Sequence, residues 1–278
     1  MRGMISAVHR QYLHIATRTI SYFDSDPTAR TARVALLTHA FPLGAAMWEG
    51  QVKAMPAGWR LLAPDLRGFG GSTLPEPDDS PAIDDYASDV IDFLRELGVE
   101  SAVLGGCSMG GYVTMAVLRR APQLAHAVVL ANTRAGADSL EGRANRRSML
   151  AIVDREGPSG VARDMVTKLL GKTTLAERSD VEPVIRRLTK PQSPAALRGA
   201  ILRMMERPDS SAVIESISVP LLIVAGDEDV LIPLDESKKM HAANSNAELV
   251  IVPRAGHLVN LEDPAAFNDA LRGFLGRL

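Results

Sequence analysis

Six short, almost uninterrupted apolar runs are spread along most of this 278-residue chain. They cover residues 34–38, 61–63, 102–104, 128–131, 221–225 and 249–252. Runs of this length and continuity are typical of strands that are buried on both faces of a parallel sheet. A stretch at residues 12–22 alternates and is rich in β-forming residues, so it predicts one or two antiparallel strands at an edge of that sheet.

Segments with helical patterning separate several of these runs. Residues 84–97 repeat apolar side chains at helical spacing and end at Gly98, and residues 109–120 follow a glycine-rich turn. Residues 264–278 begin with a proline directly after Asp263, a residue type that favours helix N-caps. Strands that alternate with helices predict an α/β fold with a doubly wound, mostly parallel sheet.

One long stretch, residues 134–216, interrupts the alternation, because it lacks a convincing strand run and is rich in Arg, Ala and Leu. Five prolines divide it: Pro158, Pro183, Pro191, Pro194 and Pro208. We expect short amphipathic helices inserted between two sheet strands. They either pack on the core or cover a site as a lid, and we favour the lid. The expected domains are the first part of the core at 1–133, a helical cap at 134–216 and the second part of the core at 217–278.

Charge and cysteine content exclude several classes of function. The 31 basic and 33 acidic residues nearly cancel, so no basic surplus favours nucleic acid or an anionic membrane as a partner. The single cysteine, Cys107, excludes an intramolecular disulfide and a four-cysteine zinc site. The first twenty residues lack the apolar segment of a secretory signal. Glycines punctuate the long uncharged stretch at 101–118, which favours strand, turn and helix over a membrane span. We therefore expect a cytoplasmic protein.

The strongest chemical signal is the sequence Gly106-Cys107-Ser108-Met109-Gly110. A G-x-S-x-G pattern places a serine nucleophile on a tight turn from strand to helix, and the glycines leave room for that turn. A glycine-rich turn with an incidental serine would give the same five letters. The apolar run before the motif and the helical pattern after it favour the nucleophile.

A serine hydroxyl needs a base, and in this kind of site the chain order is serine, acid, histidine. Three histidines follow Ser108: His126, His241 and His257. Only His257 lies in a loop after a predicted strand, at the sheet edge where ligands bind in open α/β sheets. The acid is expected in the loop after the 221–225 run. Three carboxylates are adjacent there, and their spacing does not choose among them: Asp227, Glu228 and Asp229.

Four motifs, spread over essentially the whole chain, resemble those of the α/β-hydrolase fold superfamily. They are His39-Ala40-Phe41-Pro42, the D-x-R-G-x-G-x-S segment at 65–72, Gly226-x-x-Asp229-x-x-x-Pro233 and Gly256-His257. The resemblance selects Asp229 as the acid. It also implies a Ser108–His257–Asp229 triad and an oxyanion hole made by the backbone N–H groups of Phe41 and Met109. Ala40 departs from the family, which usually has glycine there, and alanine is disfavoured if that position needs a positive φ.

The resemblance implies a serine hydrolase that cleaves carboxylic esters of small acyl groups through an acyl-enzyme, without metal or organic cofactor. A serine nucleophile argues against the dehalogenase and epoxide-hydrolase branches, which use aspartate. Three alternatives stay open: a lactone hydrolase similar to 3-oxoadipate enol-lactonases, a cofactor-free perhydrolase, and a catalytically silent binding protein.

The substrate itself is weakly specified by the sequence. The segments at 132–138 and 141–143 resemble the start of the cap in enol-lactonases. A lactone that carries a carboxylate needs an arginine near the pocket, and Arg134 and Arg143 are the candidates. The expected partner is thus a small-molecule ester or lactone. Self-association into a homo-oligomer is left open.

Overall fold

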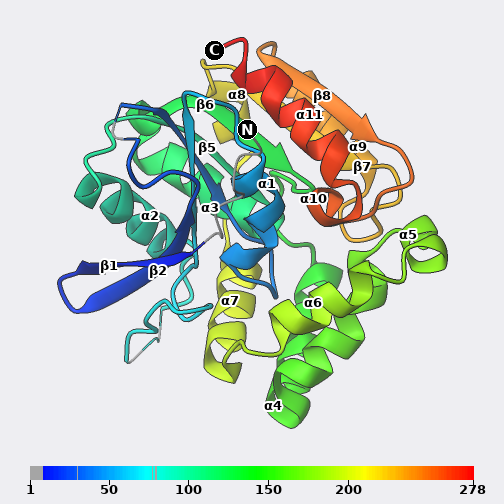
Figure 1. Cartoon of the computed structure of the whole chain (residues 1–278). Helices are drawn as coiled ribbons and strands as arrows, with labels where there is room; N and C mark the ends of the chain where they lie inside the picture. The colour runs from blue at the N-terminus through cyan, green and yellow to red at the C-terminus, as the bar shows by residue number, and fades with distance from the viewer. Residues whose placement is uncertain (1–8, 30, 77, 79) are drawn as a thin grey trace, which may run out of the picture.

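A computed structural model describes residues 9–29, 31–76, 78 and 80–278. Its centre is an eight-stranded sheet with the order β1-β2-β4-β3-β5-β6-β7-β8 (Figure 1). β1 (Arg10–Ile15) and β2 (Arg18–Asp24) form an antiparallel hairpin at one edge, and β2 also runs antiparallel to β4 (Trp59–Pro64). The edge hairpin predicted at residues 12–22 is therefore confirmed.

The rest of the sheet is parallel. Each strand from β4 onward pairs in parallel with its neighbour. The remaining strands are β3 (Arg33–Thr38), β5 (Ala102–Cys107), β6 (Ala125–Ala131), β7 (Leu221–Gly226) and β8 (Ala247–Val252). All six apolar runs of the sequence lie within these strands. The carboxyl ends of the parallel strands therefore meet at one edge of the sheet, where ligands bind in folds of this kind.

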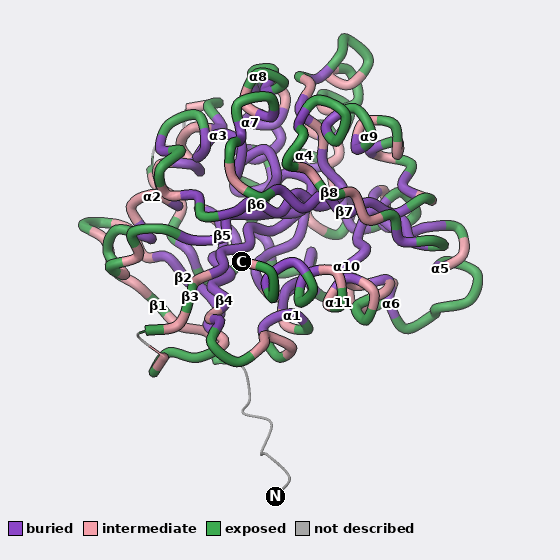
Figure 2. The backbone as a smooth tube through the Cα atoms, turned by 90° about the horizontal axis from the view of Figure 1, so that it is seen from above, coloured by how far each residue is buried: buried purple, intermediate pink, exposed green. Residues whose placement is uncertain are grey.

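Helices cover both faces of the sheet (Figure 2). On one face lie α2 (Asp84–Glu96), α3 (Met109–Arg120), α8 (Ser211–Ser216) and α9 (Leu234–Ala243). On the other lie α1 (Glu49–Lys53), α10 (Val259–Glu262) and α11 (Pro264–Leu275). Two short 3₁₀ turns, η1 (Ala45–Trp48) and η2 (Pro122–Leu124), complete the core. The doubly wound α/β architecture predicted from the sequence is confirmed.

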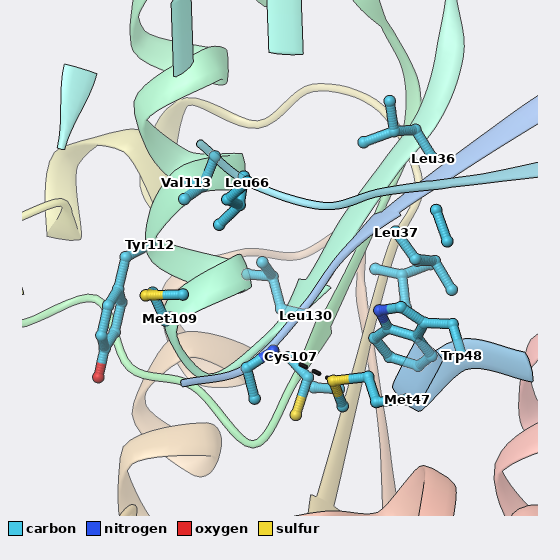
Figure 3. Close-up of a cluster of buried hydrophobic side chains, with 14 of the residues drawn as sticks. Leu36, Leu37, Met47, Trp48, Leu66, Cys107, Met109, Tyr112, Val113 and Leu130 are labelled. Carbon is cyan, nitrogen blue, oxygen red and sulfur yellow. Dashed lines mark hydrogen bonds between the residues drawn. The ribbon is translucent and has the colours of Figure 1, made fainter. Parts of the chain in front are cut away.

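The hydrophobic core follows the central strands. Because helices lie above and below them, β5 and β7 are buried at every position. Leu36 and Leu37 of β3 pack beside Trp48 of η1 in the same cluster as Leu130 of β6 (Figure 3). Burying a side chain of this size contributes about 1.5–3 kcal/mol. This packing holds the carboxyl ends of β3, β5 and β6 in fixed positions.

Two helix ends follow from local sequence signals. The Asp263 carboxylate accepts a hydrogen bond from the Ala266 amide at 2.9 Å, and Pro264 opens α11, as the N-cap interpretation predicted. Gly98 follows α2 with a φ of +68°, which suits the end of a helix. The helix predicted over 109–120 has the bounds of α3.

A group of helices separates β6 from β7 and lies together beside the sheet (Figure 1). It comprises α4 (Leu140–Leu169), α5 (Lys172–Glu177), α6 (Val181–Thr189) and α7 (Pro194–Glu206). α4 packs against α6 and α7, and it is broken at Gly157, whose φ is +59°. α8 follows α7 but packs against α3 and α9 on the sheet face. We call α4 to α7 the helical insertion.

In the described part of the chain, no helix is both long and apolar enough to cross a membrane. The expectation that the N-terminus carries no secretory signal concerns residues 1–20. Residues 1–8 of that stretch lie outside the described part.

Candidate active site

Ser108 lies on the turn between β5 and α3 in a strained backbone conformation. Its φ of +54° and ψ of −113° are unusual for any residue other than glycine, and such conformations cost about 1–3 kcal/mol. Its amide donates to the Ala131 carbonyl at 2.9 Å, and the Thr133 hydroxyl donates to its carbonyl at 2.8 Å. β6 and the loop after it therefore hold the turn in place.

The glycines of the motif are needed because backbone segments touch there. A Cβ on Gly106 would lie 2.3 Å from the carbonyl carbon of Gly110, and a Cβ on Gly110 would lie 2.2 Å from the Thr38 carbonyl oxygen. Both distances are far inside van der Waals contact, and the clashing atoms belong to the backbone, which cannot move aside. The G-x-S-x-G pattern therefore has a steric cause in this fold.

Cys107 is buried behind this turn in the hydrophobic cluster (Figure 3). Burial raises the pKa of its thiol, so the sulfur stays protonated. The thiol points to the His257 carbonyl oxygen at 3.7 Å. Cys107 packs as a small apolar side chain beside Ser108.

Asp229 and His257 come from the loops after β7 and β8, and the two side chains meet. The distance between His257 Nδ1 and Asp229 Oδ2 is 2.7 Å, and both side chains are almost fully buried. A Cβ on Gly226 would lie 2.2 Å from the Ala255 and Gly256 carbonyl oxygens. Glycine at the start of the acid loop thus lets that loop approach the histidine loop.

Several donors fix the Asp229 carboxylate. Its Oδ1 accepts from the Leu231 and Ile232 amides, each at 2.9 Å. Burial by itself raises the pKa of Asp229, but the neighbouring His257 and these hydrogen bonds outweigh burial and lower the pKa below its usual value. The carboxylate is therefore ionised at neutral pH and faces the Nδ1 side of the imidazole.

Asn132, at the end of β6, also contacts this pair and is missing from the sequence predictions of the site. Its Nδ2 donates to Asp229 Oδ2 and to the Gly256 carbonyl, both at 3.0 Å. Its φ is +45°, which asparagine tolerates better than most residues. A polar residue directly after a predicted buried strand was the only sequence signal for it.

The other candidate acids and bases point elsewhere. Asp227 accepts from the Arg254 amide at 2.7 Å, and Glu228 accepts from the Thr173 amide at 2.8 Å. The remaining two histidines after Ser108 are exposed, one in β6 and one on α9: His126 and His241. Of the three adjacent carboxylates, Asp229 is the one that contacts His257.

Ser108 and His257 both line a cavity of about 410 Å³ between the strand ends and the helical insertion. The side chain of Ser108 is buried, with 9 % of the residue exposed. Apolar side chains from both parts of the chain form much of the wall, among them Met149 and Met165 of α4 and Leu231 and Ile232 of the acid loop. A cavity of this size matches a small organic molecule.

Phe41 lines the cavity from the loop after β3, and Met109 is the first residue of α3. Within the described residues, neither backbone N–H donates a hydrogen bond to another group. Ala40 does not have a positive φ, so an alanine there is not strained. Alanine in place of the family's usual glycine therefore does not strain this loop.

The ring of His39 supports the loop after β3 through two hydrogen bonds. Burial lowers the pKa of His39, so its ring is neutral. The Leu66 amide donates to His39 Nε2 at 3.1 Å, so the proton of the neutral ring is on Nδ1. Nδ1 donates that proton to the Ala40 carbonyl at 3.1 Å.

The two predicted substrate-binding arginines have different positions. Arg134 lines the cavity, where its guanidinium donates to Asp138. Arg143 does not line the cavity, and its Nη1 donates to Glu206 of α7 at 3.1 Å. Arg146, three residues further along α4, lines the cavity instead. Which arginine of α4 faces the cavity depends on how α4 packs against α7, and the sequence did not show this.

The helical insertion is joined directly to the histidine loop and to α10. The His257 amide donates to the Leu169 carbonyl at 3.2 Å, and the Gly171 amide donates to Glu262 Oε2 at 2.8 Å. A Cβ on Gly256 would lie 2.2 Å from the Gly171 nitrogen. The end of α4 is thus fixed beside the imidazole.

No group of three or more His, Cys, Asp or Glu side chains placed to hold a metal ion occurs in the parts of the chain that the structure describes. The polar residues that line the cavity are Ser108, His257, Tyr112, Asn145, Ser148 and the charged residues of α4 and its preceding loop.

Comparison with known proteins shows similarity of both sequence and fold. The sequence profile of the Alpha/beta hydrolase family matches residues 35–270. A thermophilic esterase from Thermogutta terrifontis, in a structure with malate bound, is 32% identical with a TM-score of 0.89, over 97% of this chain and 98% of that one. The 3-oxoadipate enol-lactonase 2 of Acinetobacter baylyi is 25% identical, over 83% of this chain and 84% of that protein. A putative carbamate hydrolase, RutD, of Agrobacterium fabrum is 26% identical, over 89% and 95%.

Proposed function

This chain belongs to the alpha/beta hydrolase family, and from that premise we propose that it is a serine hydrolase of carboxylic esters with small acyl groups. The family membership supplies hydrolysis as the general activity. The proposal adds the nucleophile, the reaction path and the ester bond.

One observation carries the proposal: Ser108, on a strained turn, and His257, hydrogen-bonded to Asp229, line the same cavity. A strained, buried serine at a strand end is costly to maintain, and such strain is concentrated at functional sites. Asp229 fixes the imidazole so that Nδ1 faces the carboxylate and Nε2 is left to accept a proton.

Acylation follows from this arrangement. Ser108 Oγ attacks the ester carbonyl while His257 Nε2 takes the hydroxyl proton. The ionised Asp229 stabilises the imidazolium that forms. The backbone N–H groups of Phe41 and Met109 hold the negative oxygen of the tetrahedral intermediate, where each donor contributes about 3–4 kcal/mol in comparable sites. His257 then protonates the departing alcohol, which leaves an acyl group on Ser108.

Deacylation repeats the same steps with water as the nucleophile. His257 removes a proton from water, the hydroxide attacks the acyl carbonyl, and the proton returns to Ser108 Oγ as the carboxylic acid leaves. One ester and one water are consumed, and one acid and one alcohol are formed. The helical insertion, within the proposed cap at 134–216, limits substrate size because α4 forms one wall of the cavity.

Lactone hydrolysis is the second candidate, since it uses the same acyl transfer on a cyclic ester. The cationic Arg134 at the cavity wall favours it, because an enol-lactone such as the one named for the A. baylyi relative carries a carboxylate. The malate named with the T. terrifontis esterase is also a carboxylate. Perhydrolysis would need peroxide in place of water, and no feature of the cavity favours it.

Hydrolysis of 4-nitrophenyl acetate and butyrate by wild type and Ser108→Ala protein tests the proposal. A panel of small lactones and alkyl carbamates is assayed in parallel. We expect turnover by the wild type and at least a 10³-fold loss in the variant, because the nucleophile is absent. A serine-directed fluorophosphonate should label the wild type once, at Ser108.

Equal ester turnover in the two proteins would remove Ser108 as the nucleophile. Folded protein that is neither labelled nor active would favour the catalytically silent binding protein. Faster turnover of lactones than of the esters would favour lactone hydrolysis as the function.

A further inference from the structure

Three guanidinium groups surround one carboxylate beside the cavity. Asp138 is buried, and its Oδ1 accepts from Arg207 Nη1 at 2.8 Å and from Arg134 Nη2. Its Oδ2 accepts from Arg146 Nε at 3.1 Å. Three guanidinium groups therefore contact one carboxylate directly. Asp209 also interacts with Arg207, and Glu236 interacts with Arg134, so these carboxylates offset part of the positive charge. Charge interactions are strong in this partly desolvated place.

Arg207 has a structural role in this cluster. It is buried, its Nη2 donates to the Gly136 carbonyl at 2.8 Å, and its Nη1 donates to the Met204 carbonyl at 2.6 Å. Its guanidinium also lies over the ring of Tyr112, 3.9 Å from the centroid. Arg207 is therefore fixed in the fold and balances the charge of Asp138.

Arg134 and Arg146 are different, because both line the cavity and retain free donors. Each makes a single side-chain hydrogen bond within the described residues, to Asp138, although a guanidinium has five N–H donors. The Nε of Arg134, like that of Arg207, is buried without a partner in that part of the chain. The side chains of Arg134 and Arg146 are half-buried, and unmet donors in such a positively charged place favour an anionic ligand.

The other charged residues that line the cavity do not offset this positive charge. Lys168 and Asp164 also line it, and they pair with each other at 2.7 Å, four residues apart on α4. Met149 and Ile152 lie on the same helix and give the wall an apolar part. The cavity therefore combines a reactive serine, an apolar wall and one cationic corner.

We propose that Arg134 and Arg146 form a carboxylate-binding subsite, and that the substrate is an ester or lactone that carries a free carboxylate. This inference rests on the proposed function, because the bound molecule is the one that Ser108 attacks. A carboxylate matches the planar donor edge of a guanidinium and can take two hydrogen bonds from it. The subsite selects the charged half-ester over its neutral ester.

Two substrate pairs test the subsite, one for each side of the ester. The first is 4-nitrophenyl hydrogen adipate against 4-nitrophenyl methyl adipate, with the charge on the acyl side. The second is 3-acetoxybenzoate against methyl 3-acetoxybenzoate, with the charge on the alcohol side. The measured quantity is the ratio of kcat/KM for the charged substrate to that for the neutral one. In the wild type we expect at least one pair to give a ratio above about 10.

Arg146→Gln and Arg134→Gln should each lower that ratio by about 10- to 100-fold, the effect of one lost charge-assisted contact. Arg143→Gln is the matched control, since Arg143 lies on α4 and pairs with Glu206 outside the cavity lining. Its ratio should stay within about twofold of the wild type. Each variant removes one contact to the buried Asp138, and the two arginine side chains are equally exposed, at 23%. If one variant fails to fold, the other carries the test.

Binding of adipate to Ser108→Ala protein, measured by calorimetry, separates this inference from the proposed function. Adipate binding that weakens at least tenfold on adding Arg146→Gln supports the subsite even if no ester is cleaved. A wild type that cleaves neutral esters through Ser108 but shows no charged preference, or keeps it in both arginine variants, overturns the subsite and leaves the proposed function intact.

Discussion

Asn132→Ala tests whether Asn132 positions the acid of the proposed triad or only fills space. The side chain joins the end of β6 to two loops, through Asp229 Oδ2 and the Gly256 carbonyl. The substitution removes both hydrogen bonds at once. Asp229 keeps the amides of Leu231 and Ile232 on Oδ1 and His257 on Oδ2, so the carboxylate stays in the site but loses one of the contacts that fix its orientation.

The expected loss of stability follows from four contributions. A hydrogen bond to an ionised carboxylate is worth about 1.5–3 kcal/mol, and one to a carbonyl about 0.5–1.5 kcal/mol. The φ of +45° adds about 1 kcal/mol for alanine, which tolerates this region less well than asparagine. Against these, Asn132 Oδ1 is buried without a partner in the described structure, and its removal returns about 1–3 kcal/mol. The free energy of unfolding should therefore fall by about 2 kcal/mol.

The assay measures urea unfolding together with kcat and KM for 4-nitrophenyl butyrate. We expect kcat to fall about tenfold, or 1.4 kcal/mol in the barrier, because the imidazole is held less firmly in the transition state. KM should hold, since Asn132 is not among the residues that line the cavity. Asn244→Ala is the matched control, because Asn244 is buried and its Nδ2 donates to the Ile214 and Ile217 carbonyls at 2.7 and 2.8 Å, outside the site.

The control should lose stability and keep its kcat under folding conditions. A similar fall of kcat in both variants would mean that lost stability alone lowers activity. An unchanged kcat in Asn132→Ala, beside a clear loss of stability, would refute the positioning role.

Three further predictions concern strain, sterics and pH. Ser108→Gly should unfold at a higher temperature than Ser108→Ala, since glycine adopts the φ of +54° without strain. The free energies of unfolding of the two variants should differ by about 1 kcal/mol at the midpoint, and equal midpoints would argue against stored strain. Gly110→Ala should destabilise by at least about 3 kcal/mol, because the new Cβ would lie 2.2 Å from the Thr38 carbonyl oxygen, and a denaturant midpoint near that of the wild type would contradict this. Asp138→Asn should cost about 3–5 kcal/mol at pH 7, because three arginines lose their carboxylate. Burial raises the pKa of Asp138, but its arginine neighbours outweigh burial and lower the pKa below the usual 3.8. The ionised carboxylate therefore stabilises the fold fully above about pH 4, and this stabilisation is lost as the pH falls through the lower pKa of the folded state. The difference between wild type and Asp138→Asn should therefore shrink below pH 4, and a constant difference down to pH 2 would contradict the assignment.

Most of the fold was predictable because its signals are local. Continuous apolar runs fixed the parallel strands, and Asp263 before Pro264 marked the start of α11. The division that makes 134–216 one helical cap stays a prediction; within that range, α8 packs against α3 and α9 on the sheet face. A six-residue helix carries too little periodicity to show which layer it joins.

The candidate site was predictable only in part. The motif around Ser108 and the order of the chain pointed to His257, while three adjacent carboxylates stayed equivalent until the resemblance selected Asp229. Asn132 was missed because an asparagine after a strand is also a common turn residue. The sequence did not predict that Arg146 lines the cavity in place of Arg143, because both lie on α4 and helical spacing alone does not say which side of the helix faces the cavity.

By itself the sequence determined which segments form strands and helices, because backbone propensity and apolar periodicity act over a few neighbouring residues. It also determined which residue types are available for the chemistry. Tertiary structure decided which side chains meet. Asp229 reaches His257 across 28 positions of the chain, and Asn132 reaches Asp229 across 97. Such contacts depend on the register of β6, β7 and β8 and on where α4 packs, and these are set by the burial of the whole core.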